Sequence, residues 1–208
     1  MKPVPEFDVL LFDLGGVLMD FAGFEELRGL LPGSLRRSEV RDRWIHSPAV
    51  QRFERGEITA RRFAEAVIED LEISLEPREF LSAFVEWARP PYPGAIELLQ
   101  RLGKRHRIAA LSNANELHTP LHRKRFGHVI ERLYFSDEIG VVKPDRAIFE
   151  HVIGDLGVPA GRIAFFDDTP VNVEAARQQG LRAFEVDGLM HLEAQLHDLG
   201  LLSPGPAP

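Results

Sequence analysis

The chain has 208 residues, of which 44% are hydrophobic and 27% charged, and its formal net charge is −7 at pH 7. These values predict a globular protein with a full-sized core, and they argue against a disordered, fibrous or membrane protein. The acidic balance disfavours nucleic acid as a partner. The absence of cysteine excludes disulfides, thiolate metal sites and cysteine nucleophiles. No export signal is visible at the N-terminus, so we expect a cytoplasmic enzyme.

Short apolar runs predict five strands, near residues 7–13, 107–112, 133–135, 163–167 and 182–186. Helices are marked by a proline near the first turn and a glycine past the last one. Three segments have this pattern: 93–103, 144–157 and 169–180. Strands that alternate with helices predict an α/β fold with a doubly wound parallel sheet, similar to a Rossmann fold.

This alternation is interrupted between the first two strands. Residues 21–92 show helical patterns and no convincing strand, which predicts an inserted helical domain over residues 18–92 and a core made of residues 1–17 and 93–208. Thr59 is placed to cap one helix and Pro77 to begin another. The proline-rich stretch 89–94 is stiff, and we interpret it as the hinge that returns the chain to the core.

Two of the predicted strands end in aspartate. The run 9–12 leads into Asp13, and the run 163–166 leads into Asp167 and Asp168. The carboxyl ends of parallel strands open into one crevice, so these carboxylates should converge. Two unit charges about 4 Å apart repel by roughly 4 kcal/mol at an effective dielectric constant of about 20. A divalent cation is the simplest way to stabilise such a cluster.

Four short motifs occur in order: Phe12-Asp13-Leu14-Gly15-Gly16-Val17, Leu111-Ser112-Asn113, Val142-Lys143-Pro144 and Phe166-Asp167-Asp168-Thr169-Pro170-Val171-Asn172. Together they resemble the motifs of the haloacid dehalogenase superfamily, over residues 13–180. Within that superfamily the chain is similar to helical-capped sugar-phosphate phosphatases of the alpha-glucose-1-phosphatase-like group. The stretch 54–58 in the helical insertion also fits that group.

The resemblance implies a phosphatase that works through a covalent intermediate. Asp13 would attack phosphorus as a carboxylate nucleophile and form an aspartyl-phosphate. Ser112 and Asn113 would donate hydrogen bonds to the phosphoryl oxygens. Lys143 would balance the charge of Asp13 and of the incoming phosphate.

The resemblance also implies a Mg²⁺ cofactor, which prefers oxygen ligands. Asp13, the carbonyl oxygen of Gly15 and Asp168 are the expected ligands. Asp167 and Asn172 are expected either as ligands or as groups that orient them.

One position departs from the family pattern. Most phosphatases of this superfamily carry a second aspartate two residues after the nucleophile, as general acid and base, and here that residue is Gly15. Positioned acid–base catalysis contributes about 10² to 10⁴-fold, or roughly 3 to 5 kcal/mol of barrier. Three explanations are open: a leaving group that needs little protonation, such as an anomeric phosphate; another residue in this role, with Asp20 as a weak candidate; or a slow or inactive enzyme.

Two other functions compete with a phosphatase. A carbon–halogen hydrolase also lacks the second aspartate, but its chemistry uses no metal and the acidic pair 167–168 argues against it. A binding or regulatory module that keeps the fold is the other alternative, and phosphoryl transfer to an acceptor other than water stays open. We expect a monomer.

The expected substrate is a small, polar phosphate monoester, with sugar phosphates ahead of nucleotides. The helical insertion should close over Asp13 and exclude water. Its candidates for contact with the leaving group are Phe21, Phe24, Trp44, Arg52 and Arg55. The histidines show no metal-ligand spacing, and we expect His118, His122 and His128 on the surface or facing the insertion.

Overall fold

The computed structural model describes residues 7–202 and contains a five-stranded parallel sheet. The strand order is β5 (Arg132–Phe135), β4 (Arg107–Ser112), β1 (Val9–Phe12), β6 (Ile163–Asp167) and β7 (Arg182–Glu185). All five agree with the predicted strands to within two residues at each end. The central strand β1 pairs with β4 on one side and β6 on the other, with Phe12 opposite Ala110 and Phe166. After β1 the chain adds β4 and β5 on one side and then β6 and β7 on the other, so the strand order reverses beside β1. In open α/β sheets, ligands bind at this point.

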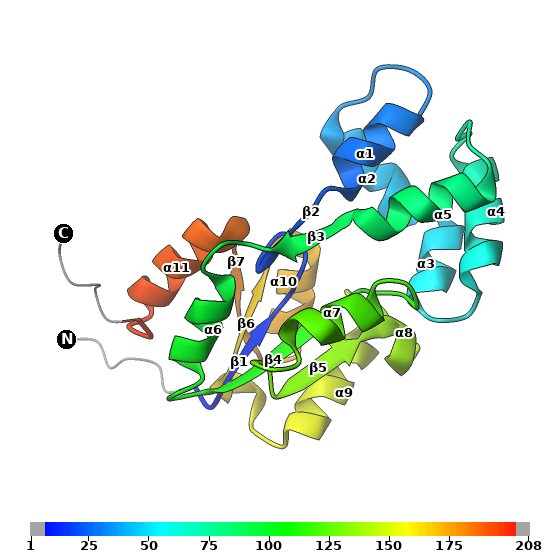
Figure 1. Cartoon of the computed structure of the whole chain (residues 1–208). Coiled ribbons are helices and arrows are strands. Elements are labelled where there is room, and N and C mark those ends of the chain that lie inside the picture. Colours follow the sequence, from blue (N-terminus) through cyan, green and yellow to red (C-terminus); the bar gives the residue numbers. More distant parts are fainter. Residues whose placement is uncertain (1–6, 203–208) are drawn as a thin grey trace.

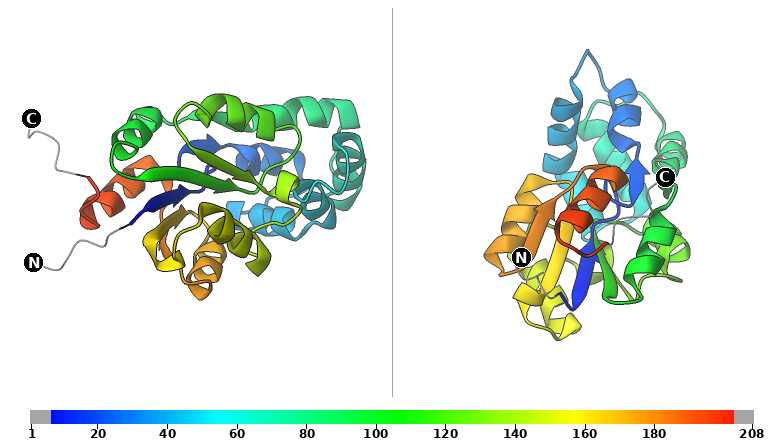
Figure 2. Two further views of the ribbon diagram at one scale, coloured as in Figure 1. Left: turned by 90° about the horizontal axis from the view of Figure 1, so that it is seen from below. Right: turned by 90° about the vertical axis from the view of Figure 1, so that its left-hand side faces the viewer.

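Helices cover both faces of the sheet (Figure 2). One face packs against α6 (Ala95–Leu102), α7 (Thr119–Phe126) and α11 (Gly188–Asp198), and the other packs against α9 (Arg146–Leu156) and α10 (Pro170–Gln178). Alternate residues of β1 point to opposite faces of the sheet. Leu10 and Phe12 pack on the face covered by α6, α7 and α11, and Val9 and Leu11 on the face covered by α9 and α10. Because both faces are covered, the strand is apolar throughout. A short helix, α8 (Ser136–Ile139), follows β5, and a 3₁₀ turn, η1 (Ala160–Arg162), precedes β6.

Five further helices form a separate layer beyond the carboxyl end of the sheet (Figure 1). They are α1 (Gly23–Leu30), α2 (Arg37–His46), α3 (Pro48–Glu54), α4 (Ala60–Asp70) and α5 (Pro77–Glu86), and we call them the cap helices. Their interior is an aromatic cluster in which Phe53 and Phe63 stack with ring centres 4.2 Å apart. As predicted, Thr59 caps α4 and Pro77 begins α5.

The cap helices are joined to the sheet by a two-stranded antiparallel ribbon that the sequence analysis did not predict. It consists of β2 (Met19–Phe21) and β3 (Ala88–Pro91), with Met19 opposite Pro91 and Phe21 opposite Ala88. The prediction that residues 21–92 contain no strand is therefore wrong. Prolines are compatible with an edge strand because the fixed φ suits extended backbone and the missing N–H can face outward.

In the part of the chain that the structure describes, no helix combines the length and the apolar character needed to cross a membrane. The first and last six residues of the predicted core lie outside the described residues.

Candidate active site

Three carboxylates meet at the carboxyl end of the sheet. Asp13 directly follows β1, Asp167 ends the neighbouring strand β6, and Asp168 comes next. One carboxylate oxygen from each lies within 4.8 Å of the others. The backbone continues the pairing of the two strands, since the Asp13 N–H donates to the carbonyl oxygen of Phe166 at 2.8 Å. The predicted convergence of the two acidic strand ends is thus present in the structure.

Lys143 lies against this cluster and is almost completely buried. Its Nζ is 2.9 Å from Oδ1 of Asp13 and 2.6 Å from Oδ2 of Asp167, and it also donates to the carbonyl oxygen of Leu111 at 3.0 Å. Its side chain is 2% exposed. Burial alone would lower the pKa of Lys143, but the carboxylates of Asp13 and Asp167 outweigh burial and raise the pKa. The ammonium group therefore stays charged at the centre of the site.

A single ammonium group does not compensate three carboxylates. Burial raises the pKa of Asp13 to about 7; Lys143 opposes this shift, and the carboxylates of Asp167 and Asp168 add to it. Burial and then the charge of Asp167 also raise the pKa of Asp168. A surplus of buried carboxylate oxygens is the donor set that a hard divalent cation prefers, so these residues fit such an ion.

The two neighbouring aspartates have different surroundings. Asp167 is fully buried, and its carboxylate accepts from the Thr169 N–H at 2.8 Å, the Asn172 side-chain amide at 3.0 Å and the Lys143 ammonium at 2.6 Å. Its lone pairs are therefore largely committed to holding Lys143 and the start of α10.

Asp168 is half-buried and less committed. Oδ1 accepts from the Thr169 hydroxyl at 3.0 Å, and that hydroxyl in turn accepts from Nη2 of Arg41 at 2.6 Å. Arg41 belongs to the cap helix α2. One side chain of the cap helices is thus linked through a single hydroxyl group to the carboxylate cluster.

The loop after Asp13 brings the backbone close to the cluster. Gly16 has φ +75°, and a Cβ atom there would lie 2.6 Å from Oδ2 of Asp168, so only glycine fits. Gly15 differs, because its Cβ would meet only the Cβ of Phe21, at 3.6 Å, which is ordinary contact. Lack of space therefore does not explain the missing carboxylate at position 15.

Ser112 and Asn113 lie at the end of β4, beside Lys143. Ser112 is buried, and its hydroxyl is 3.4 Å from the carbonyl oxygen of Asn113. The Asn113 side chain holds the backbone of Lys143 from both sides, since Oδ1 accepts from the Lys143 N–H at 2.8 Å and Nδ2 donates to its carbonyl oxygen at 3.1 Å. One of the two amide N–H groups of Asn113 is thus engaged within the protein, and one remains for another acceptor.

Glu54 is a partly buried carboxyl group that the sequence analysis did not single out. It is the last residue of α3, next to Phe53 in the aromatic cluster. Burial raises its pKa to about 7, although the charges of Lys143 and Arg55 oppose the shift, and Asp13 adds to it. The next residue, Arg55, pairs with Asp145, two residues after Lys143, so this end of α3 lies against the loop that carries Lys143. The one available sequence signal was its place in the stretch 54–58.

Polar contacts fix the cap helices over this end of the sheet. Nη2 of Arg55 lies 3.2 Å from Oδ2 of Asp145, in the loop just after Lys143. The N–H of Ala60, at the start of α4, donates to the carboxylate of Glu116, which follows β4. Both contacts join groups more than 50 residues apart in the sequence.

The other predicted contact residues have different surroundings. Trp44 is 5% exposed in the interior of the cap helices, so the expectation that it faces a leaving group is wrong. Its indole ring packs there because burying so large an apolar surface is favourable. Arg52 is exposed and pairs with Glu57 at 3.5 Å. Phe21 and Phe24 are half-buried and meet edge to face, with ring centres 5.7 Å apart.

Two of the three histidines are buried. His118 faces the cap helices as expected: its Nε2 donates to the carbonyl oxygen of Phe84 at 2.9 Å, and burial lowers its pKa to about 4. His122 is also buried, with its pKa lowered to about 3, and only His128 is exposed. A surface position is therefore wrong for His122, because its ring packs against Phe135, whereas His118 stacks on Phe84 of α5 and occupies one of the two expected positions.

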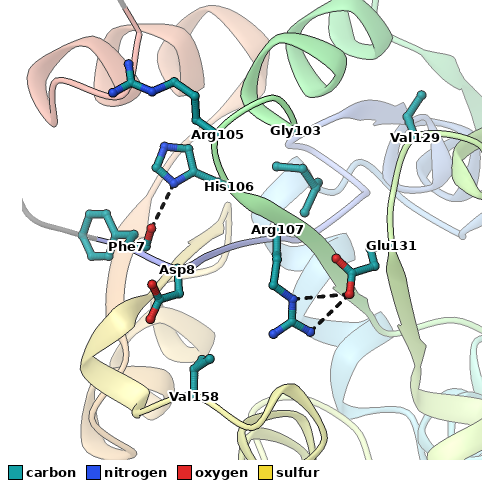
Figure 3. Close-up of a pocket in the computed structure, with 10 residues that line it drawn as sticks. Phe7, Asp8, Gly103, Arg105, His106, Arg107, Val129, Glu131 and Val158 are labelled. Carbon is teal, nitrogen blue, oxygen red and sulfur yellow. Dashed lines mark hydrogen bonds and ion pairs between the residues drawn. The ribbon is translucent and has the colours of Figure 1, made fainter.

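A surface hollow of about 600 Å³ lies at the opposite end of the sheet (Figure 3). Two contacts join residues of its lining: Arg107 lies 3.2 Å from Glu131, and the His106 ring donates to the carbonyl oxygen of Phe7 at 3.0 Å. These residues precede or begin β1 and β4, whereas the carboxylate cluster follows the ends of β1 and β6. The hollow is thus separate from the candidate active site.

Known proteins share the sequence pattern and the fold. A D-ribitol-5-phosphate phosphatase from Bacteroides thetaiotaomicron is 22% identical over 185 residues, which cover 85% of this chain and 90% of the relative. A crystal structure of a HAD family enzyme from the same organism, in complex with magnesium and inorganic phosphate, superposes with a TM-score of 0.68 at 22% identity, covering 87% of this chain and 94% of that one.

A crystal structure of a dehalogenase superposes with a TM-score of 0.69 at 18% identity, covering 96% of this chain and 98% of that one. The family model of haloacid dehalogenase-like hydrolases matches residues 7–180, which include β1, β6 and all three carboxylates. The chain therefore belongs to the haloacid dehalogenase-like hydrolase family.

Proposed function

We propose that the protein is a Mg²⁺-dependent phosphatase that hydrolyses small phosphate monoesters, with sugar phosphates favoured, through an aspartyl-phosphate on Asp13. The observation that carries the proposal is the cluster of Asp13, Asp167 and Asp168 around the buried ammonium group of Lys143. A relative named as a D-ribitol-5-phosphate phosphatase, and a neighbouring structure that holds magnesium and inorganic phosphate, support it.

In this proposal Asp13, the carbonyl oxygen of Gly15 and Asp168 hold the Mg²⁺ ion, with Asp167 and Asn172 orienting the groups around it. When bound, the ion supplies positive charge that neutralises the phosphate oxygens and the surplus carboxylates. The site has three carboxylates and one ammonium group, and this excess of negative charge supports the binding of a cation. Asp168 is the aspartate of the pair with fewer protein donors, which suits a ligand.

Four residues of the chain contribute to the chemical steps of the proposed reaction. An Asp13 carboxylate oxygen attacks phosphorus and forms the aspartyl-phosphate, which splits one displacement into two easier ones. Lys143 stabilises the charge on the phosphoryl oxygens as a fixed cation, while Asp167 holds it in place. Ser112 and the uncommitted N–H of Asn113 donate to the same oxygens. Water then hydrolyses the aspartyl-phosphate.

We propose that the insertion over residues 18–92 acts as a cap that closes over the substrate and excludes water. Its contacts with the core, such as Arg55 with Asp145, support this arrangement. A small, polar leaving group is favoured over a nucleotide or a protein because one similar protein is named as a D-ribitol-5-phosphate phosphatase. A carbon–halogen hydrolase is the weaker alternative, because three converging carboxylates repel in a metal-free site.

The proposal is tested by phosphate release from a panel of small phosphate esters, with Mg²⁺ or with EDTA. The expected result is turnover that needs Mg²⁺ and is lost in Asp13→Asn. The panel includes sugar 1-phosphates, other sugar and polyol phosphates, nucleotides and a halogenated acid. Halide release that is insensitive to EDTA would refute the proposal in favour of the dehalogenase, and a folded protein inactive on the whole panel would refute it in favour of a binding module.

A further inference from the structure

We propose that Glu54, a residue of the cap helices, is the general acid and base of this reaction and takes the place of the aspartate that is absent at Gly15. The inference rests on the proposed phosphatase function. It assigns a catalytic role to a residue outside the four motifs and explains how hydrolysis proceeds without the usual carboxylate.

The chain around Glu54 is fixed on both sides of it. Phe53 is anchored in the aromatic cluster, 1% exposed. Arg55 pairs with Asp145, two residues after Lys143. Gly56 packs so closely on α8 that a Cβ atom there would lie 2.5 Å from a backbone carbonyl oxygen. One residue before Glu54 and two after it thus hold this segment between the cap helices and the loop that carries Lys143.

The carboxyl group of Glu54 is uncommitted. Within the described residues it has no hydrogen bond and no ion pair, although it interacts electrostatically with Lys143, Arg55 and Asp13. Burial raises its pKa to about 7, so both protonation states are populated near neutral pH. A general acid that later serves as a base works best with a pKa near the working pH.

Other titratable groups fit this role less well. Asp167 is surrounded by donors and holds Lys143. Asp20, the candidate from the sequence, is exposed on β2. His118 is buried and neutral, with its Nε2 bound to a backbone carbonyl oxygen of α5. Glu54, by contrast, is partly buried and has neither a hydrogen-bond partner among the described residues nor a proposed metal-binding role.

The two half-reactions are balanced as follows. In the first, an oxygen of Asp13 bonds to phosphorus, the bond from phosphorus to the ester oxygen breaks, and Glu54 gives its proton to that oxygen, so an alcohol leaves. In the second, Glu54 takes a proton from water as the water oxygen bonds to phosphorus and the bond to Asp13 breaks. The products are the alcohol and inorganic phosphate, and Glu54 is protonated again.

The test compares Glu54→Gln with Glu57→Gln, an exposed carboxylate three residues along the same segment. Single-turnover phosphorylation of Asp13 is measured with a sugar phosphate, whose alkoxide leaving group needs a proton, and with 4-nitrophenyl phosphate, whose leaving group does not. Glu54→Gln should slow the sugar phosphate by about 10² to 10⁴-fold and 4-nitrophenyl phosphate by less than about tenfold. It should also abolish the fall in rate at alkaline pH that deprotonation of the acid causes. Glu57→Gln should match the wild type in both respects.

A second variant tests the same role from the other side of the site. A Cβ atom at position 15 would make only ordinary contact, with the Cβ of Phe21 at 3.6 Å. The double variant Gly15→Asp/Glu54→Gln should therefore turn over the sugar phosphate at least about tenfold faster than Glu54→Gln alone. Thermal unfolding of each variant confirms that the protein is folded.

The outcomes separate the two proposals. If the wild type hydrolyses phosphate esters but Glu54→Gln slows both substrates equally and keeps the alkaline limb, Glu54 is not the acid, and the phosphatase function stands. If the folded wild type releases no phosphate from any ester, both proposals fail. If Asp13→Asn is inactive and Glu54→Gln shows the leaving-group dependence, both are supported.

Discussion

Lys143 offers the sharpest test of how the carboxylate cluster is stabilised. Its ammonium group contacts Asp13 and Asp167 at 2.9 and 2.6 Å with 2% of the side chain exposed. Lys143→Met keeps the apolar stem and removes the charge, which leaves the carboxylates without their cation. Breaking a buried ion pair by removing one partner costs about 3 to 5 kcal/mol. For a chain of this length, that corresponds to a fall in Tm of roughly 6 to 20 °C.

The assay is thermal unfolding in EDTA, with Lys124→Met on the exposed side of α7 as the matched control. The control should change the free energy of unfolding by less than about 0.5 kcal/mol. In Lys143→Met the folded-state pKa values of Asp13 and Asp168, which burial already raises and Lys143 lowers, rise further above their unfolded values of about 4. A raised carboxyl pKa costs stability above the unfolded pKa, and the cost disappears as pH falls toward it.

The deficit of Lys143→Met relative to the wild type should therefore be larger at pH 8 than at pH 5. Two results would refute the reasoning: a fall in Tm no greater than that of Lys124→Met, or a deficit that grows as the pH is lowered.

Further perturbations separate the contributions of the glycine loop, the metal ligands and the contacts of the cap helices. Gly16→Ala should destabilise the fold by more than Gly140→Ala. Both glycines have positive φ, so each substitution costs about 1 to 2 kcal/mol, but only at position 16 does the new Cβ atom also meet Asp168. Equal losses of unfolding free energy in denaturant titrations would contradict this prediction. Mg²⁺ should raise the Tm of the wild type and not of Asp168→Asn, and an unchanged shift in the variant would exclude Asp168 as a ligand. Calorimetry in two buffers should show protons released when Mg²⁺ binds near pH 7, with weaker binding at pH 5.5, because the metal must displace the proton of Asp13, whose pKa is raised to about 7. Arg55→Ala should lower the free energy of unfolding by less than about 1 kcal/mol, because the ion pair with Asp145 is partly exposed. It should nevertheless raise KM for the phosphate ester, because it weakens the closed position of the cap helices. A KM equal to that of the wild type would show that this contact does not contribute to closure.

The sheet and its acidic edge could be predicted from the sequence because their signals are local. Each buried strand is a short apolar run, and Gly157, at φ +68°, ends α9 where the glycine pattern places the end. The convergence of Asp13 and Asp167 then follows from the parallel topology alone. No long-range contact had to be known for these predictions.

The missed features depend on contacts that no local pattern encodes. The pairing of β3 with β2 joins residues about 70 positions apart, and the prolines of β3 hide it from any propensity argument. Trp44 faces the interior of the cap helices because α3, α4 and α5 surround it. The segment that carries Glu54 lies against the core because Gly56 contacts the backbone of α8 and Arg55 pairs with Asp145. The sequence shows that the usual aspartate is missing at position 15, but the carboxyl group that we propose in its place, Glu54, lies in the cap helices.

The ribbon of β2 and β3 also restricts how the two layers of the molecule can separate. The outgoing and returning chains are hydrogen-bonded to each other, with the N–H of Tyr92 donating to the carbonyl oxygen of Leu18 at 3.0 Å. Two paired strands bend out of their plane more easily than they stretch, slide or twist. Rotation about a single axis is then the soft motion, and each opening breaks the same distant contacts in the same sequence. A rotation of this kind would return α3 to the same position against the core at each closure, which would give Glu54 the positional accuracy that proton transfer requires.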